Sequence, residues 1–242
     1  MSQPRALVIV PAELRLFLRH GRRGAAVPVA VNGTSSLGHL VESLGVPRTE
    51  VGRLLVNGDP VTAGYRPGPG DVVTVGAVRR PQPLPSARFV LDVHLGTLAR
   101  RLRLVGVDAA YARDADDDAL VEQANAERRV LLTQDRGLLC RRKLWLGAYV
   151  RGARPDVQFL DVLARFRPPL APWNRCPACN GHLSVAAKAA VEPALRPGTR
   201  RTYYAFSRCQ GCARVYWHGA HSQRLEQIVT SAVDAVGNPA GE

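Results

Sequence analysis

The first part of the chain shows the hydrophobic pattern of a small mixed domain. Apolar and polar positions alternate at residues 14–18 and 27–31, two more short apolar stretches follow, and one stretch has apolar residues at helical spacing before Gly45. The predicted strands cover residues 14–18, 27–31, 53–56 and 71–75, and the predicted helix covers 37–44. A ββαββ order of this size is typical of a β-grasp domain, which we place at residues 1–80.

The pattern changes after a proline-rich linker at residues 81–87, which is stiffened towards polyproline II. In residues 88–170, short apolar strands alternate with amphipathic helices. The strands are predicted at 89–91, 109–112 and 130–133, with helices after the first two. Alternation of strands and helices implies right-handed crossovers and a parallel sheet with helices on both faces. The predicted fold class is therefore α/β.

Four of the five cysteines form two Cys-x-x-Cys pairs near the end of the chain, and these predict one structural zinc ion. Structural zinc prefers four tetrahedral ligands, and each Cys-x-x-Cys turn supplies two thiolates. The ligands are Cys176, Cys179, Cys209 and Cys212. A pair of redox dithiols would need a thioredoxin-like context, which the surrounding sequence lacks.

We place a zinc ribbon at residues 171–230, with a hairpin or loop through residues 197–198, and a flexible polar tail at 231–242. His218 and His221 lie close by, but four cysteines already fill the ligand shell. Cys140 has no paired histidine and is interpreted as a packed thiol.

The charge of the chain indicates a polyanionic partner. The formal net charge is +13 and the pI is about 10.5, which favours nucleic acid. No apolar run approaches the ~20 residues that cross a bilayer, and no signal-peptide segment is evident. We therefore expect a soluble, cytoplasmic protein with no membrane partner.

Three aspartates follow predicted strands of the middle region. Asp92 and Asp135 come just after strands, and Asp117 begins the helix that follows the second strand. The carboxyl ends of parallel strands meet at one rim, where open α/β sheets bind ligands. Three converging carboxylates require a cation, and Mg²⁺ or Mn²⁺ suits oxygen ligands. The alternative for each aspartate is helix capping.

A metal held by these carboxylates can activate water for phosphodiester hydrolysis. Basic side chains able to hold phosphates accompany the predicted rim: Arg100, Arg136, Arg141, Arg142 and Lys143.

Residues 92–106, 116–120 and 132–136 together resemble the Mut-seven C-terminal RNase family, a branch of the PIN-like (PilT N-terminal) nucleases. That family typically ends in a four-cysteine zinc ribbon followed by a Tyr-Trp-x-Gly-x-His element, which residues 216–221 resemble. Some members carry an N-terminal ubiquitin-like domain, which residues 6–78 resemble. The similarity covers nearly the whole chain.

The resemblance implies a PIN-like fold that binds Mg²⁺ or Mn²⁺ through acidic residues and cleaves single-stranded RNA. By position the acids are Asp92, Asp117 and Asp135, with Thr133 nearby; Asp116 or Asp118 can replace Asp117. PIN nucleases often have a fourth acid, for which only Asp156 and Asp161 are candidates here. At this position the sequence departs from the acidic pattern that two-metal catalysis uses.

The β-grasp region also departs from the sulfur-carrier pattern, because it lacks a free Gly-Gly terminus. We interpret it as a docking module, for a protein partner or for RNA.

The leading hypothesis for the whole protein is a metal-dependent ribonuclease. The alternative is a non-catalytic RNA-binding or adaptor protein, and a toxin of a toxin–antitoxin pair is disfavoured by the extra domains. Aromatic residues of the ribbon offer either stacking faces or a small core: Tyr203, Tyr204, Phe206 and Trp217.

Overall fold

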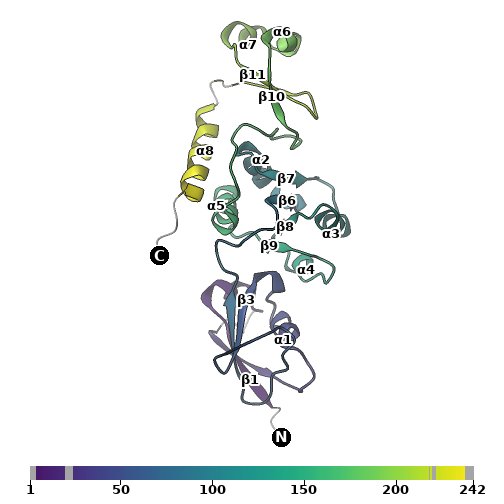
Figure 1. The fold of residues 1–242 in the computed structure, drawn as a ribbon, viewed down its shortest axis with the longest axis vertical. Helices are drawn as coiled ribbons and strands as arrows, with labels where there is room; N and C mark the ends of the chain where they lie inside the picture. Colours follow the sequence, from purple (N-terminus) through teal and green to yellow (C-terminus); the bar gives the residue numbers. More distant parts are fainter. Residues whose placement is uncertain (1–3, 20–23, 218, 220–221, 238–242) are drawn as a thin grey trace. The chain divides into compact units, whose positions relative to one another are not determined.

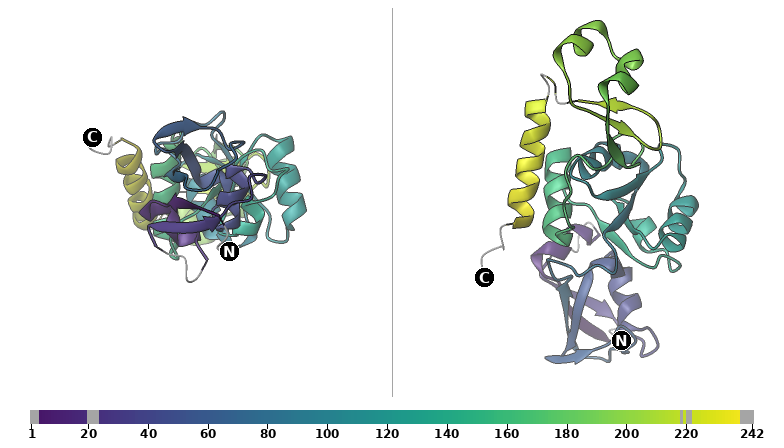
Figure 2. Two further views of the ribbon diagram at one scale, coloured as in Figure 1. Left: turned by 90° about the horizontal axis from the view of Figure 1, so that it is seen from below. Right: turned by 45° about the horizontal axis from the view of Figure 1, so that its top comes forward.

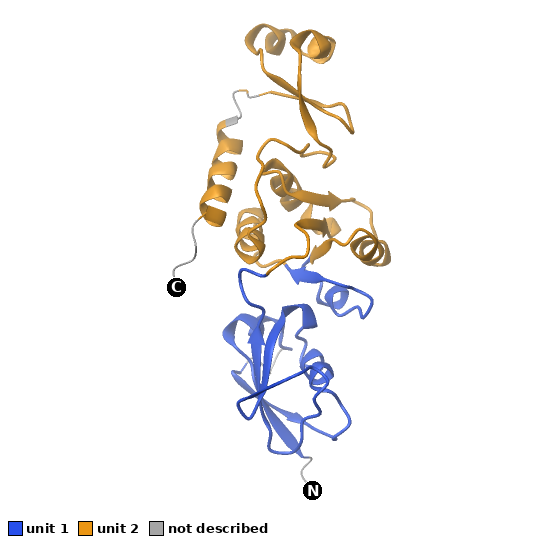
Figure 3. Cartoon of the chain, viewed as in Figure 1, with its two compact units in different colours: residues 1–82, 133–149 blue, residues 83–132, 150–242 orange. Residues whose placement is uncertain are grey.

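The computed structural model describes residues 4–19, 24–217, 219 and 222–237. The chain divides into two compact units, which do not follow chain order (Figure 3). The first unit combines Met1–Gln82 with Thr133–Tyr149, and the second combines Pro83–Leu132 with Val150–Glu242. A segment of the predicted nuclease region therefore belongs to the same compact unit as the N-terminal domain.

The first unit contains a five-stranded sheet with the order β2-β1-β5-β3-β4 (Figure 1). Strands β1 and β5 are parallel, and the other neighbours are antiparallel. The strands are β1 (Arg5–Ile9), β2 (Ala26–Ala30), β3 (Val51–Val56), β4 (Asp59–Val61) and β5 (Val72–Ala77). Helix α1 (Leu37–Ser43) buries its apolar side in the same core as the sheet. This arrangement confirms the predicted ubiquitin-like domain.

Local sequence explains the ends of these elements. The Ser36 side chain accepts a hydrogen bond from the His39 N–H and so caps α1. Gly45 follows α1 with φ +104°, and a Cβ there would lie 2.5 Å from the Phe17 carbonyl oxygen. Asn57 and Gly58 both have positive φ and form the tight turn between β3 and β4.

The strand predicted at 14–18 is wrong, because residues Ala12–Phe17 form a 3-10 helix, η1. Leu14, Phe17 and Leu18 are all buried, and this three- to four-residue spacing fits a helical turn. The first strand of the sheet is instead β1, which alternates regularly and buries Ala6 and Val8.

Residues 133–149 are bound into the first unit by polar and aromatic contacts. This segment contains α4 (Arg136–Leu139) and β9 (Gly147–Tyr149). The Arg136 guanidinium donates to the carbonyls of Phe17 (3.0 Å) and Leu16 (2.7 Å) and lies over the Phe17 ring. The Phe17 and Tyr149 rings meet edge to face, with centroids 4.9 Å apart. The ubiquitin-like domain thereby fixes the segment that carries Asp135.

Glu50 holds the other end of this segment. It is 1% exposed, lies in η2 (Arg48–Glu50), and its carboxylate accepts a hydrogen bond from the Tyr149 N–H at 2.8 Å. We expect Glu50→Ala to weaken the attachment of residues 133–149 by about 1–3 kcal/mol, because the part-buried Tyr149 N–H loses its partner. Amide hydrogen exchange of this segment should accelerate. Glu42→Ala is the matched control, since its ion pair with half-exposed Arg48 is worth little. Equal exchange in both variants would contradict the role of Glu50.

The second unit is built on parallel strands in the order β7-β6-β8 (Figure 1). These are β6 (Arg88–Leu91), β7 (Asp108–Tyr111) and β8 (Val130–Thr133), of which the first three residues of β8 belong to this unit. Helices α2 (Gly96–Leu104) and α5 (Pro155–Phe166) lie on one side of the strands, and α3 (Asp117–Ala126) lies on the other. The short 3-10 helix η3 (Val93–Leu95) connects β6 to α2. The predicted parallel α/β sheet is confirmed.

Burial explains why the sequences of β6 and β8 are continuous stretches of apolar residues. Phe89, Val90 and Leu91 of β6 are fully buried, as are Leu131 and Leu132 of β8. Strands covered on both faces have no polar side to present, which is typical of parallel sheets. Gly106 follows α2 with φ +86°, and a Cβ there would lie 2.1 Å from the Ala171 carbonyl oxygen.

The cysteine region forms a small antiparallel sheet, β10-β11-β12. Its strands are β10 (Leu183–Ala186), β11 (Phe206–Cys209) and β12 (Val215–Tyr216). The predicted hairpin or loop through residues 197–198 is wrong, because this insertion is mostly helical. It contains α6 (Lys188–Val191), η4 (Glu192–Ala194) and α7 (Pro197–Thr202). Pro197 occupies the first turn of α7, where its missing N–H costs nothing, and Val191 and Leu195 pack against Phe206.

The predicted flexible tail at 231–242 is wrong for residues 231–237. They continue helix α8 (Ser222–Gly237), which lies beside α5 (Figure 2). Ala232 is fully buried, and Ile228 and Val229 precede it at helical spacing. Residues 238–242 lie outside the described residues. None of the helices in the described part of the chain is long and apolar enough to cross a membrane.

Candidate functional site

The four predicted zinc ligands are brought together. All four Sγ atoms lie within 4.8 Å of one another, with Cys176 and Cys212 3.7 Å apart and Cys179 and Cys209 3.4 Å apart. Tetrahedral zinc with bonds of ~2.3 Å separates its sulfur ligands by about 3.8 Å. The donor set and its spacing therefore fit one zinc ion.

Hydrogen bonds to sulfur support the cluster. The N–H groups of Gly211 and Cys212 point at the Cys209 Sγ, at 3.3 and 3.4 Å. The Tyr216 hydroxyl lies 3.0 Å from the Cys176 Sγ. Burial raises the pKa of the Cys176 thiol, but the hydrogen bonds from Tyr216 and nearby backbone N–H groups outweigh it and lower the pKa to about 6. Cys176 is thus readily available as a thiolate ligand.

The pKa of the neighbouring Cys179 thiol is shifted in the opposite direction. Burial, together with contacts to the other three cysteines, raises the pKa of Cys179 to about 12. Four crowded thiols do not all ionise without a cation among them, which is the behaviour expected of a metal site. His218 and His221 lie outside the described residues.

The first cysteine turn is anchored to the parallel sheet by a buried arginine. Arg103 of α2 is 3% exposed and donates from Nε to the Ala109 carbonyl at 2.7 Å. Its Nη1 donates to the carbonyls of Pro177 (3.2 Å) and Ala178 (3.0 Å), which lie between the first two cysteines. Helical spacing alone predicts Arg103 on the outer face of α2, so sequence reasoning misses this anchor.

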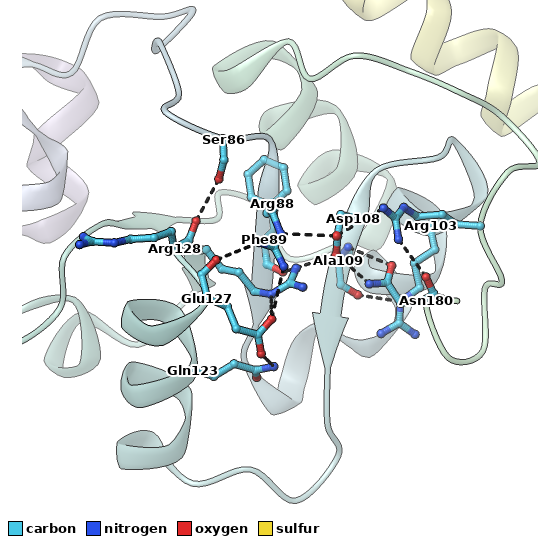
Figure 4. Close-up of polar contacts among 12 residues, drawn as sticks. Ser86, Arg88, Phe89, Arg103, Asp108, Ala109, Gln123, Glu127, Arg128 and Asn180 are labelled. Atoms are coloured by element: carbon cyan, nitrogen blue, oxygen red, sulfur yellow. Dashed lines mark hydrogen bonds and ion pairs between the residues drawn. The ribbon is translucent and has the colours of Figure 1, made fainter. Parts of the chain in front are cut away.

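Asp108 forms the second anchor, at the start of β7 (Figure 4). Its carboxylate accepts from Arg129 (2.6 Å) and from the Asn180 side chain (2.8 Å), and Arg175 lies 3.3 Å away. Asn180 also accepts a hydrogen bond from the Ala109 N–H. Burial would raise the pKa of Asp108, but the bonds from Arg129 and Asn180 outweigh it and hold the pKa below its ordinary value. The hydrogen bonds and ion pairs of Asp108 therefore join β7 to the cysteine region.

Asp92 and Asp117 belong to the second unit and have different surroundings. Asp92 directly follows β6 and is only 8% exposed; it precedes η3, yet its side chain makes no capping hydrogen bond. Asp116 takes the capping position of α3, where it accepts from the Ala119 N–H at 2.8 Å. Capping therefore accounts for Asp116, while Asp117 is exposed in the first turn of the helix.

Asp135 and Thr133 belong to the first unit. The Asp135 carboxylate caps α4 and accepts from the Gly137 N–H at 2.6 Å, and its own N–H donates to the Thr133 hydroxyl at 2.8 Å. The capping alternative thus applies to Asp135. Among the described residues, only the four cysteines form a group of three or more metal-binding side chains within 4.8 Å. The site formed by Asp92, Asp117 and Asp135 stays a prediction.

The remaining candidates differ in their surroundings. The Arg136 guanidinium is engaged with η1, and the four other basic residues are exposed: Arg100, Arg141, Arg142 and Lys143. Both candidates for a fourth acid have structural partners, because Asp156 pairs with Arg101 and Asp161 accepts from the Arg151 N–H. Cys140 is exposed rather than packed, because Leu138 and Leu139 take the inward positions of α4.

The ribbon aromatics divide between core and surface. Phe206 is buried and Tyr203 packs against its cluster, so these two belong to the ribbon's small core. Tyr204 is 75% exposed, with the Lys188 Nζ 4.0 Å from its ring centroid, and Trp217 is 41% exposed. Two aromatic faces therefore remain for stacking.

These features define an α/β protein with an N-terminal ubiquitin-like domain, a parallel-sheet domain and a four-cysteine cluster fit for a zinc ribbon. A model of the Mut7-C RNAse domain matches residues 87–229, and a model of the Mut7-C ubiquitin domain matches residues 4–83. The chain belongs to the Mut7-C RNAse domain family, which confirms the resemblance seen in the sequence. Neither a curated protein nor a solved structure matches it.

Proposed function

We propose that the protein is a metal-dependent ribonuclease that hydrolyses phosphodiester bonds of single-stranded RNA. Membership of the Mut7-C RNAse family supports a nuclease. The observation that carries the proposal is Asp92, a nearly buried carboxylate at the carboxyl end of β6 that is not used as a helix cap. Such a position at the rim of a parallel sheet is where open α/β folds bind ligands.

Asp92, Asp117 and Asp135 are the proposed ligands of Mg²⁺ or Mn²⁺, and their carboxylate oxygens are the donors that these hard ions prefer. A bound divalent ion there supplies an activated water and charge neutralisation for phosphodiester hydrolysis. Thr133 orients the Asp135 backbone, while the exposed basic residues are proposed to hold phosphates: Arg100, Arg141, Arg142 and Lys143. Arg136 is better explained as a residue that attaches the segment 133–149 to the ubiquitin-like domain.

The ribbon's zinc is structural in this proposal, and exposed Tyr204 and Trp217 offer stacking faces for bases. We place the activity in the cytoplasm, where free thiols persist. The ubiquitin-like domain is proposed to receive a protein partner. One observation favours a non-catalytic RNA-binding protein instead: both candidates for a fourth acid, Asp156 and Asp161, have structural partners.

Cleavage of labelled single-stranded RNA in Mn²⁺ or Mg²⁺ tests the proposal. We expect Asp92→Asn to lower kcat at least about a hundredfold, since loss of a charge-stabilising group commonly costs that much, and Asp135→Asn to lower it as well. Asp114→Asn, which changes an exposed aspartate outside the proposed site, is the matched control and should cleave normally.

Cleavage unchanged by Asp92→Asn and Asp135→Asn would rule out the proposed ligands. Tight RNA binding by the wild type without cleavage in either metal would favour the non-catalytic alternative.

A further inference from the structure

A cavity of about 430 Å³ in the second unit lies between the parallel-sheet domain and the cysteine region. Four arginines contribute to its lining, two from α2 (Arg100 and Arg103), one from the loop after β7 (Arg113) and one from just before β12 (Arg214). No acidic side chain is among the described residues that line it. Its volume falls within the ~300–1,000 Å³ of typical small-ligand pockets.

The four arginines differ in their exposure to solvent and in their bonding partners. Arg103 is fixed in the wall by the carbonyls of Ala109, Pro177 and Ala178 and is almost fully buried. Arg100, Arg113 and Arg214 are exposed, and no carboxylate of the described residues forms an ion pair with them. Three solvated guanidinium groups around one cavity repel one another, so an anion that enters it is attracted by all three.

The walls of the cavity suit a nucleotide better than a simple anion. Tyr111 and Tyr216 line it, and their hydroxyl groups are already engaged, with the Val93 carbonyl (2.9 Å) and the Cys176 Sγ (3.0 Å) respectively. Their rings are therefore held in place as aromatic surfaces, and Pro177 adds a further apolar wall. A Cβ at Gly96 would lie 2.7 Å from the Tyr111 Oη, so glycine permits this ring position.

We propose that this pocket binds one nucleotide unit of an RNA strand. Its phosphate lies among Arg100, Arg113 and Arg214, and its base or ribose lies against the tyrosine rings. Arginine clusters recognise phosphates, and aromatic faces stack on bases without sequence preference. This inference rests on the proposed function, because it takes RNA as the substrate. It assigns substrate binding to a joint surface of the nuclease domain and the ribbon.

The test measures binding of fluorescein-labelled oligouridylate to the full chain by anisotropy, without added divalent metal. The pocket variant carries Arg100→Ala, Arg113→Ala and Arg214→Ala. The charge-matched control carries Arg154→Ala, Arg196→Ala and Arg201→Ala, which change exposed arginines of the same unit outside the pocket. Zinc content and circular dichroism establish that both variants are folded.

We expect the pocket variant to bind about tenfold more weakly or worse. The slope of its log affinity against log salt concentration should become shallower by roughly 0.7 for each phosphate that the protein no longer neutralises. The control should change affinity at most about twofold. Replacing the three pocket residues by lysine should restore part of the affinity, because lysine keeps the charge but not the bidentate geometry.

Equal RNA affinity of the pocket variant and the control would show that the pocket does not bind RNA. Cleavage of RNA by the wild type would in that case still support the proposed ribonuclease function. Pocket-dependent binding without cleavage in Mg²⁺ or Mn²⁺ would support the pocket and reject the ribonuclease. A wild type that binds no RNA would overturn both.

Discussion

Cys176→Ser is expected to remove the metal from the chain and unfold the ribbon. Cys176 is fully buried, and its Sγ lies 3.7 Å from that of Cys212. The ribbon has a small hydrophobic core of its own, because among the described residues its cluster has three buried members, Val191, Leu195 and Phe206. Structural zinc contributes about 10–16 kcal/mol in small zinc modules, so its loss exceeds what such a cluster supplies.

Metal analysis checks this result: the wild type should carry about one zinc per chain, and Cys176→Ser should carry almost none. Limited proteolysis should then cut within residues 174–216 faster than in the wild type. Cys140→Ser is the matched control, because Cys140 is exposed and lies outside the cluster. Full zinc content in Cys176→Ser would show that the ligand assignment is wrong.

Loss of zinc should also remove contacts that the parallel-sheet domain makes with the first cysteine turn. Arg103 is held by the carbonyls of Pro177 and Ala178, which lie inside the first cysteine turn. When this turn unfolds, a buried guanidinium loses two acceptors and one wall of the arginine-lined pocket disappears. RNA binding is therefore expected to depend on a zinc ion that takes no part in the chemistry.

The sequence predicts best those features that depend on neighbouring residues. The Cys-x-x-Cys pairs place their ligands through local turns, and the apolar run at 130–133 matches β8 because a strand buried on both faces has no polar positions. The strand predicted at 14–18 is a 3-10 helix instead, because alternate and helical spacing cannot be distinguished over so few residues.

Features that depend on distant contacts were not predictable in this way. Nothing near residues 133–149 indicates that they pack against η1 and Glu50, since the partners lie about a hundred residues earlier. Helical spacing predicts Arg103 on the outer face of α2, and only the tertiary structure shows that it is buried and that both Arg103 and Asp108 contact the cysteine turn. Within the run of three aspartates, one hydrogen bond that the sequence does not predict identifies Asp116 as the cap of α3.

Asp108→Asn is expected to destabilise the second unit by about 1.5–3 kcal/mol, because the nearly buried Arg129 loses one of its two carboxylate partners and keeps only the partly exposed Glu127. The Arg129 side chain is 7% exposed and the Asp108 side chain is 17% exposed, so solvent screens their 2.6 Å ion pair poorly. Arg88 adds little, since its side chain is 46% exposed. Asparagine keeps the size of the side chain and removes its charge, so the loss of stability reports on the ion pair rather than on packing.

The pH dependence of unfolding distinguishes this ion pair from a purely structural contact. Because folding lowers the pKa of Asp108, the ionised carboxylate stabilises the native state fully above the ordinary aspartate pKa of about 3.9. That contribution is lost as the pH falls through the lowered pKa of the folded state. The Tm difference between wild type and Asp108→Asn should therefore be largest near neutral pH and shrink in acid, whereas exposed Asp114→Asn should match the wild type throughout. A Tm difference that stays constant down to strongly acidic pH would show that the charge of Asp108 does not join the cysteine turn to the sheet.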